Sequence, residues 1–185
     1  MGRIEVSLGF GALICLLAWL NGRLCLWFLL AVLVHETGHF LALRLCGVPV
    51  EGFSLKLTGA VIRTGAAGYR QELLCALAGP GASLLAAAIA CRFAPWFSIV
   101  SGGLGLLNLL PLYPLDGGRV LRCAFALLGW EDRMRPVIRA VTYGTCGLLM
   151  LLACWLTAAR QAGLWPVFAA LLLLCRVGEA NLREE

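Results

Sequence analysis

Runs of apolar residues, each long enough to enter or cross a lipid bilayer, constrain the fold of this chain more than any other feature. A spanning helix needs about 20 mostly apolar residues. Of the 185 residues here, 61% are hydrophobic and only 14% are charged, whereas soluble domains carry roughly 25% charged residues. We therefore expect an all-α polytopic membrane protein with about six transmembrane helices. The apolar runs are Ile4–Leu20, Leu24–Cys46, Leu73–Phe93, Trp96–Leu112, Val137–Ala159 and Leu164–Val177.

The first run follows Arg3 and resembles the start of a signal peptide, but no A-x-A-like cleavage site follows and a second run begins at once. We expect it to be a retained span. After loops, residues 1–185 leave no room for a separate soluble domain, so the chain is expected to form one membrane-embedded domain. Nine cysteines are scattered, mostly inside apolar runs and without a CxxC pair, and are expected to pack as small apolar residues.

The segment between the second and third runs has a different pattern. Residues 53–58 alternate strictly between apolar and polar, which is the period of a half-buried strand. Gly59 follows as a turn signal, and Val61 and Ile62 continue as a β-branched stretch. The range Val48–Thr64 is therefore predicted to form a β-hairpin at the membrane edge. The polar segment 118–136 is predicted to be a loop with a short interfacial helix.

The basic residues predict the orientation in the membrane, because Lys and Arg favour cytoplasmic loops. With the N-terminus in the cytoplasm, 12 of the 15 basic residues lie on the cytoplasmic side and only Arg23, Arg92 and Arg160 lie outside. We expect a multi-pass protein of the cell membrane with both termini cytoplasmic. A nucleic-acid partner is not expected, since the basic residues are spread between apolar runs rather than gathered on one face.

The only two histidines of the chain, His35 and His39, stand inside the second apolar run with Glu36 between them. Side chains four residues apart lie on one face of a helix, so the two imidazoles can bind one zinc ion while Glu36 reaches a water beside it. A chance occurrence is costly, because an ionisable side chain in a span costs roughly 2.5–3.5 kcal/mol unless it is paired. The H-E-x-x-H pattern on a helix is therefore read as a metalloprotease motif.

Zinc needs a third protein ligand and an open position for water. Besides Glu36, the one acidic residue beside an apolar run is Asp116, and the others lie in loops or at span edges. Prolines and glycines interrupt the backbone around Asp116, which at membrane depth is tolerated only where the backbone is buried in protein or lines a wet cavity. We expect His35, His39 and Asp116 to bind one zinc ion per chain and Glu36 to act as the general base.

On these residues the sequence resembles the site-2 protease family of intramembrane zinc metalloproteases. His35 to His39 resembles the zinc helix of the family, and Asn108, Pro111, Asp116 and Gly117 match its second motif, N-x-x-P-x-x-x-x-D-G. The predicted hairpin resembles the membrane-associated β-loop of the family. Gly79-Pro80 stands where the family often has a Gly-Pro pair, and Ser83 stands near a position where it often has asparagine.

The resemblance implies hydrolysis of peptide bonds in membrane-embedded or membrane-associated protein substrates, by a single intramembrane metalloprotease domain spanning residues 1–185. Asn108 is expected to donate a hydrogen bond to the developing oxyanion, with Tyr113 as a second candidate donor. The six-span plan is most similar to the stage IV sporulation FB type, without its CBS domain. That similarity implies regulated intramembrane proteolysis in sporulation, release of a precursor sigma factor and a membrane-bound regulatory partner.

Two other classes of protein remain open from the sequence. A transporter or metal-permeation protein also carries ionisable residues inside its spans, but it usually shows a repeat with paired broken helices. A catalytically inactive scaffold would be expected to lack one of His35, Glu36, His39 or Asp116, and all four are present. One tightly bound zinc per chain would favour the protease.

Overall fold

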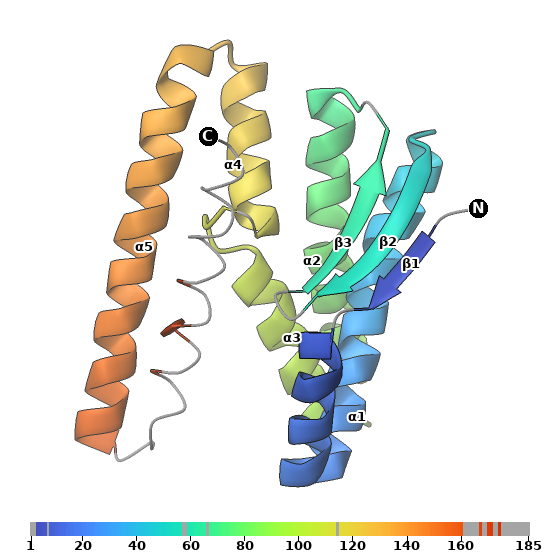
Figure 1. Ribbon diagram of the computed structural model, residues 1–185, viewed down its shortest axis with the longest axis vertical. Coiled ribbons are helices and arrows are strands. Elements are labelled where there is room, and N and C mark those ends of the chain that lie inside the picture. Colours follow the sequence, from blue (N-terminus) through green and yellow to red (C-terminus); the bar gives the residue numbers. More distant parts are fainter. Residues whose placement is uncertain are drawn as a thin grey trace. The chain divides into compact units, whose positions relative to one another are not determined.

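The computed structural model describes residues 3–6, 8–56, 59–65, 67–113 and 115–160, together with Val167, Ala170, Leu171 and Leu174. The chain folds into two compact units, Met1–Leu109 and Leu110–Glu185. The first contains the strands β1 to β3 and the helices α1 to α3, and the second contains α4 and α5 (Figure 1).

Helix α1 (Leu8–Leu45) covers the first two apolar runs and is broken between them. The break is at Asn21, whose φ of −162° and ψ of 97° are extended. The Asn21 Oδ1 accepts a hydrogen bond of 3.1 Å from the Leu24 N–H, the bond of a helix N-cap, so a new helix begins at this residue. The Asn-Gly-Arg sequence between the two apolar runs therefore marks a real interruption.

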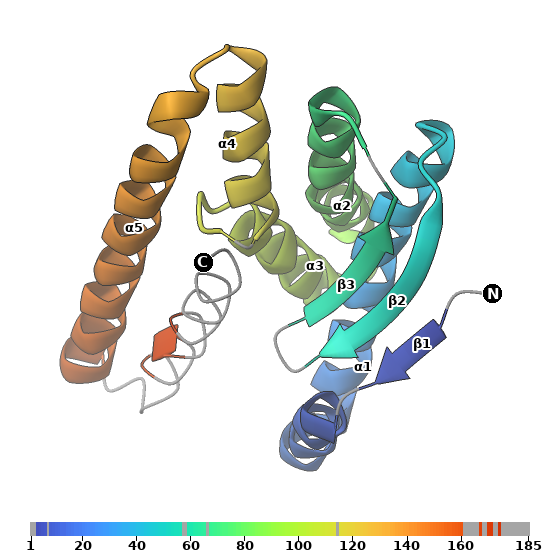
Figure 2. The ribbon, with the colours of Figure 1, turned by 45° about the horizontal axis from the view of Figure 1, so that its top comes forward.

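Three strands form one sheet in the order β1-β2-β3 (Figure 2). Strand β1 (Arg3–Val6) runs parallel to β2 (Val50–Lys56), and β2 runs antiparallel to β3 (Gly59–Thr64), with a bulge between Val50 and Gly52. The antiparallel pair lies in the segment where the sequence predicts a hairpin. The prediction that the first membrane helix begins at Ile4 is wrong, because Arg3–Val6 is a strand and the helix begins at Leu8.

Helices α2 (Tyr69–Ala90) and α3 (Pro95–Asn108) pack against α1. A Cβ added to Gly38 of α1 would lie 2.5 Å from the carbonyl oxygen of Ala78, so only glycine permits this approach of α1 to α2. Elsewhere in the unit, Trp27 and Phe97 pack with their ring centroids 6.1 Å apart beside the buried Ala31. The core of this unit thus contains both a glycine-mediated helix contact and a cluster of aromatic and small apolar residues.

In the second unit, α4 (Asp116–Leu127) is followed by α5 (Glu131–Arg160). The turn between them uses Gly129 at a φ of +71°, with hydrogen bonds from Gly129 N–H to Ala126 and from Trp130 N–H to Phe125 that satisfy the last carbonyls of α4. The segment 118–136, predicted to be a loop with a short helix, does contain the short helix α4. The rest of the segment is mostly helical as well, because the helix predicted from Val137 begins at Glu131.

Three of the described helical segments are long and apolar enough to cross a membrane: Asn21–Leu45, Tyr69–Ala90 and Asp132–Ala159. Large apolar side chains are exposed along them, for example Leu33, Leu85 and Leu151, as expected for helices that face lipid. They coincide with the second, third and fifth predicted spans. The 14-residue α3 is about 21 Å long, less than the hydrocarbon thickness, and the sixth predicted span lies almost entirely outside the described residues.

Candidate metal centre

His35 and His39 lie one turn apart on α1, and both are buried, with exposed fractions of 4% and 8%. Their Nε2 atoms are 3.1 Å apart, and the two rings meet edge to face with centroids 4.8 Å apart. The helix therefore turns both ring nitrogens to one point, as the four-residue spacing predicts.

Helix α2 holds the opposite nitrogen of each ring. His39 Nδ1 lies 2.7 Å from the carbonyl oxygen of Cys75, and His35 Nδ1 lies 3.0 Å from the hydroxyl oxygen of Ser83. A carbonyl only accepts, so His39 must donate from Nδ1, and in its neutral form it keeps a lone pair on Nε2. This is the tautomer that binds a metal through Nε2, with the outer nitrogen fixed by a hydrogen bond.

The distance between the two Nε2 atoms suits zinc. Zinc binds imidazole nitrogen at about 2.0–2.1 Å in a tetrahedral arrangement, which places two such nitrogens about 3.3 Å apart. The observed separation of 3.1 Å is close to this value. Two buried imidazoles offer nitrogen ligands of the type that zinc prefers, so the residues present fit the predicted metal.

The close approach of His39 to α2 depends on Gly79. A Cβ built on Gly79 would collide with the His39 ring, at 2.5 Å from Cε1 and closer still to Nε2. Pro80, the next residue, is fully buried in the same helix. In the sequence, the Gly79-Pro80 pair is noted only through the family resemblance. The structure gives a physical reason for the glycine, because the absence of a side chain at Gly79 leaves the space that the His39 ring occupies.

Glu36 follows His35 on α1 and is half-buried. Consecutive residues of a helix differ in direction by about 100°, so Glu36 lies beside the histidine face rather than on it. That position suits a carboxylate that acts on a water next to the metal without being a ligand.

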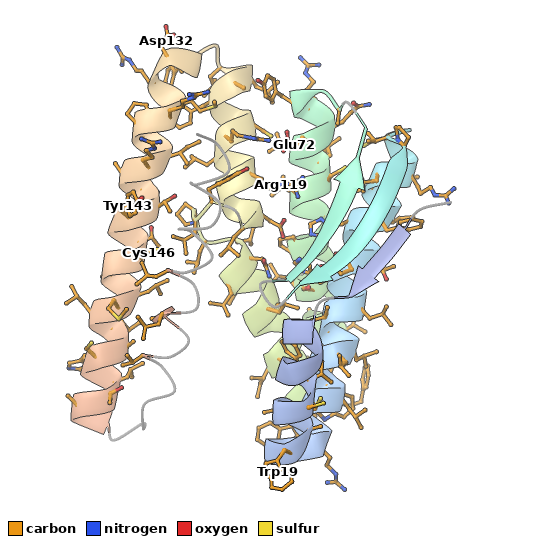
Figure 3. The ribbon with its side chains drawn as sticks, in the orientation of Figure 1. Trp19, Glu72, Arg119, Asp132, Tyr143 and Cys146 are labelled. Atoms are coloured by element: carbon orange, nitrogen blue, oxygen red, sulfur yellow. The ribbon has the colours of Figure 1, made fainter. Side chains whose placement is uncertain are left out.

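Asp116 belongs to the second unit, where it is the first residue of α4 and is 7% exposed. A carboxylate in the first turn of a helix is stabilised by the helix dipole. Arg119 Nη1, on the same helix (Figure 3), lies 3.7 Å from Asp116 Oδ1. A Cβ on Gly118 would lie 2.5 Å from the Tyr113 nitrogen, so the glycines after Asp116 allow the preceding turn to fold tightly against the helix.

Asn108 is the last residue of α3 and is half-buried. Its Nδ2 donates a hydrogen bond of 2.9 Å to the carbonyl oxygen of Leu104, one turn earlier. An amide nitrogen carries two protons, so a second donor remains on this group. For Tyr113, the backbone N–H lies 3.4 Å from Thr142 Oγ1, and the Arg122 guanidinium lies over the ring at 5.8 Å.

Two groups of the histidine environment were not predicted from the sequence. The Cys75 carbonyl belongs to the backbone, so no residue type in the sequence could indicate that it bonds His39. For the Ser83 hydroxyl the sequence gives a weak indication. Ser83 is a polar residue in an apolar run, and it lies four residues after Gly79, on the same face of α2 as that glycine.

Comparisons with known proteins agree with this geometry. The profile of peptidase family M50 matches residues 23–94 and 84–152. The chain is 33% identical over 190 residues to Rip3 of Mycobacterium tuberculosis, covering 88% of this chain and 48% of Rip3. It is also 30% identical over 105 residues to the zinc metalloprotease MJ0392 of Methanocaldococcus jannaschii, covering 50% of this chain and 31% of that one.

The fold is also found among solved structures. The site-2 protease from Methanocaldococcus jannaschii superposes with a TM-score of 0.70 at 20% identity, covering 96% of this chain and 89% of that one. The chain spans about half the length of Rip3, the curated relative that it matches over most of its own length. The family match and the identity to Rip3 establish the relationship, and the chain belongs to peptidase family M50, the site-2 protease family.

Proposed function

We propose that this protein is an intramembrane zinc metalloendopeptidase that hydrolyses peptide bonds of membrane-embedded or membrane-associated proteins within or near the bilayer. The observation that carries the proposal is the histidine pair of α1, whose Nε2 atoms converge to 3.1 Å while α2 holds both Nδ1 atoms. Family membership and the homologous zinc metalloprotease MJ0392 support it.

In the proposed site, His35 and His39 bind zinc through Nε2, and Asp116 supplies the third ligand through its carboxylate. Arg119, whose Nη1 lies 3.7 Å from Asp116 Oδ1, would help to orient that carboxylate. A histidine pair with one carboxylate and an open position is a known catalytic zinc arrangement. When bound, zinc would polarise the substrate carbonyl and acidify the attacking water.

The other steps belong to the side chains of this chain. Glu36 accepts a proton from the water as it attacks the peptide carbonyl and delivers it to the leaving amine. Asn108 donates its second amide proton to the developing oxyanion, with Tyr113 as the alternative donor. Burial of the two histidines in an apolar helix strengthens these electrostatic contributions relative to water.

The β-sheet supports a membrane-inserted position for the predicted hairpin. Strand β1 pairs with β2, so the segments before and after α1 lie side by side, and α1 must run into the membrane and return. The first limb, residues 8–20, is about 20 Å long, and His35 lies about 21 Å beyond Asn21 on the second limb. The end of β1 and His35 therefore lie at similar distances from the break at Asn21 along the two limbs of α1. This supports a sheet that lies at the same depth in the membrane as the histidine pair.

A substrate helix must be unwound before its carbonyl can be attacked, because its peptide bonds are hydrogen-bonded internally. A strand that binds the unwound substrate edge-on needs an open edge, and β2 is the central strand, with β1 and β3 on its two sides. We therefore assign strand addition to the outer edge of β3, which among the described residues pairs only with β2.

The finer assignments extend this function. The two units together would form one domain over residues 1–185, with six spans and both termini in the cytoplasm. Release of a transcription regulator such as a precursor sigma factor, in sporulation and under a membrane-bound regulator, rests on the resemblance of the sequence motifs. No nucleic-acid partner is proposed.

The test of the proposed function is cleavage of tagged single-span candidate proteins co-expressed with this chain. We expect a product that disappears with Glu36→Gln, that is suppressed by a zinc chelator and that returns when zinc is added. The purified protein should contain about one zinc per chain. Metal-free preparations that cleave at full rate would refute the proposal, and metal flux across vesicles without cleavage would favour the transporter.

A further inference from the structure

The two histidines of the metal centre are held by α2 in different ways. His39 Nδ1 is bonded to a backbone carbonyl, that of Cys75, which no substitution removes. His35 Nδ1 is bonded to a side chain, the hydroxyl of Ser83, at 3.0 Å. The Nδ1 atom of His35 therefore contacts a side-chain oxygen of α2, which a substitution can remove.

Ser83 is itself fixed in place. Its side chain has an exposed fraction of 0%. Its carbonyl oxygen accepts a hydrogen bond of 2.9 Å from the hydroxyl of Ser101 on α3. Gly105, one turn further along α3, leaves room for Ser83, since a Cβ there would lie 3.1 Å from the Ser83 Cβ. Helix α3 therefore sets the position of the hydroxyl that His35 contacts.

A hydroxyl suits this place because it can both donate and accept. The Nε2 atoms of the two histidines are 3.1 Å apart, and His39 Nε2 carries a lone pair because Nδ1 donates to Cys75. With zinc bound, both Nε2 atoms need lone pairs, so the His35 proton must reside on Nδ1 and Ser83 must accept it.

We propose that Ser83 is a positioning residue of the zinc site: its hydroxyl accepts the Nδ1 proton of His35 and so holds His35 in the Nδ1–H tautomer, with Nε2 directed at the metal. The inference rests on the proposed assignment of His35 and His39 as ligands. Removal of such an outer hydrogen-bond partner typically lowers metal affinity or activity by about 10- to 100-fold.

The test uses the fact that the chain has two histidines. Protein labelled with ¹⁵N-histidine and purified without a histidine tag gives four ring-nitrogen signals, all from the site. A His39→Gln variant assigns the pair that belongs to His35. In the wild type, zinc should convert both Nε2 signals to the metal-bound type and leave both Nδ1 atoms protonated.

Ser83→Ala should shift the His35 Nδ1 signal, leave the His39 signals nearly unchanged and lower zinc affinity by about 10- to 100-fold, measured by competition with a chelator. Ser83→Cys, which has nearly the same size but a weak acceptor, should give the same change if the alanine variant does not accumulate.

Ser98→Ala is the matched control. It removes a half-buried serine hydroxyl of α3 that donates a 2.7 Å hydrogen bond to the Ala87 carbonyl of α2 rather than to a histidine, so it should lower thermal stability while zinc affinity and the four signals stay as in the wild type. Wild-type zinc affinity and an unshifted His35 Nδ1 signal in Ser83→Ala would overturn the inference. If zinc leaves both Nε2 signals of the wild type unchanged, the assignment of His35 and His39 as ligands fails. Because this result comes from the wild type alone, it is distinct from a failure of the Ser83 inference.

Discussion

At the scale of single residues, sequence reasoning reaches those side chains whose chemistry is unusual for their surroundings. His35, Glu36 and His39 stand out because ionisable groups in an apolar run need compensation. The structure then gives His35 and His39 converging Nε2 atoms. The hydrogen bonds of these rings could not be predicted, because one partner is the Cys75 backbone carbonyl and the other is the Ser83 hydroxyl, to which the sequence assigns no role.

Glu36→Gln should reduce cleavage by at least about 100-fold, because an amide cannot accept the proton of the attacking water. Zinc content should stay near the wild-type value, since the variant keeps the proposed ligands. Single-turnover cleavage and metal analysis on the same preparation measure both. Cleavage at the wild-type rate would remove Glu36 from the mechanism.

Asp116→Ala should lower both zinc affinity and activity, because a zinc site with two protein ligands is poor. The matched control is Asp132→Ala, an exposed acidic residue at the start of α5 in the same unit (Figure 3), which should bind zinc as the wild type does. Equal zinc affinities of the two variants in chelator competition would show that Asp116 is not a ligand.

At the scale of elements, the errors of the sequence prediction have identifiable causes. Strand β1 has four residues at the edge of an apolar run, too few for a period of two to be recognised. It becomes a strand by pairing with β2, some 50 residues away, which is a tertiary effect. For segment 118–136 the polar composition predicts a loop with only a short helix, whereas Gly118, which weakens a helix in isolation, is needed for close packing of α4 against Tyr113.

Gly79→Ala tests whether α2 must approach His39 through a residue without a side chain. The added Cβ would collide with the His39 ring, so we expect a loss of zinc affinity and a destabilisation of about 1–3 kcal/mol, typical of overpacking. Gly81→Ala is the control, since no atom lies within 4 Å of its Cβ position and alanine favours the helix by up to about 1 kcal/mol. Thermal unfolding and zinc titration should therefore separate the two variants, and similar behaviour would contradict the packing argument.

Proline at successive positions of β3 tests the proposed substrate edge. Backbone N–H groups of neighbouring strand residues point to opposite edges, so of Val61→Pro and Ile62→Pro one removes a bond to β2 and the other a donor on the outer edge. The outer-edge variant should lose most cleavage while keeping zinc and thermal stability. The inner-edge variant should be less stable. If the more stable of the two cleaves at the wild-type rate, the substrate does not add to β3.

At the scale of the whole molecule, two independent features predict the same membrane topology for the start of the chain. One is the pairing of β1 with β2, and the other is the distribution of the basic residues. Paired strands lie on the same side of the membrane region, so α1 must enter and return, with its break at Asn21 on the far side. The distribution of basic residues predicts that Arg3, Lys56 and Arg63 lie on the cytoplasmic side and Arg23 outside. Two unrelated physical effects, backbone pairing and charge asymmetry, therefore indicate the same path for the first 64 residues.

Reporter insertions measure that path directly. A reporter beside Arg23 or Arg92 should be found outside, whereas one at Gly129, between α4 and α5, should be cytoplasmic. A fusion after Glu185 should also be cytoplasmic, because six crossings return the chain to the side where it began. An outer location for that fusion alone would mean an odd number of crossings, so a predicted span would be missing. Inversion of every reporter would place the sheet and the site in the opposite half of the bilayer.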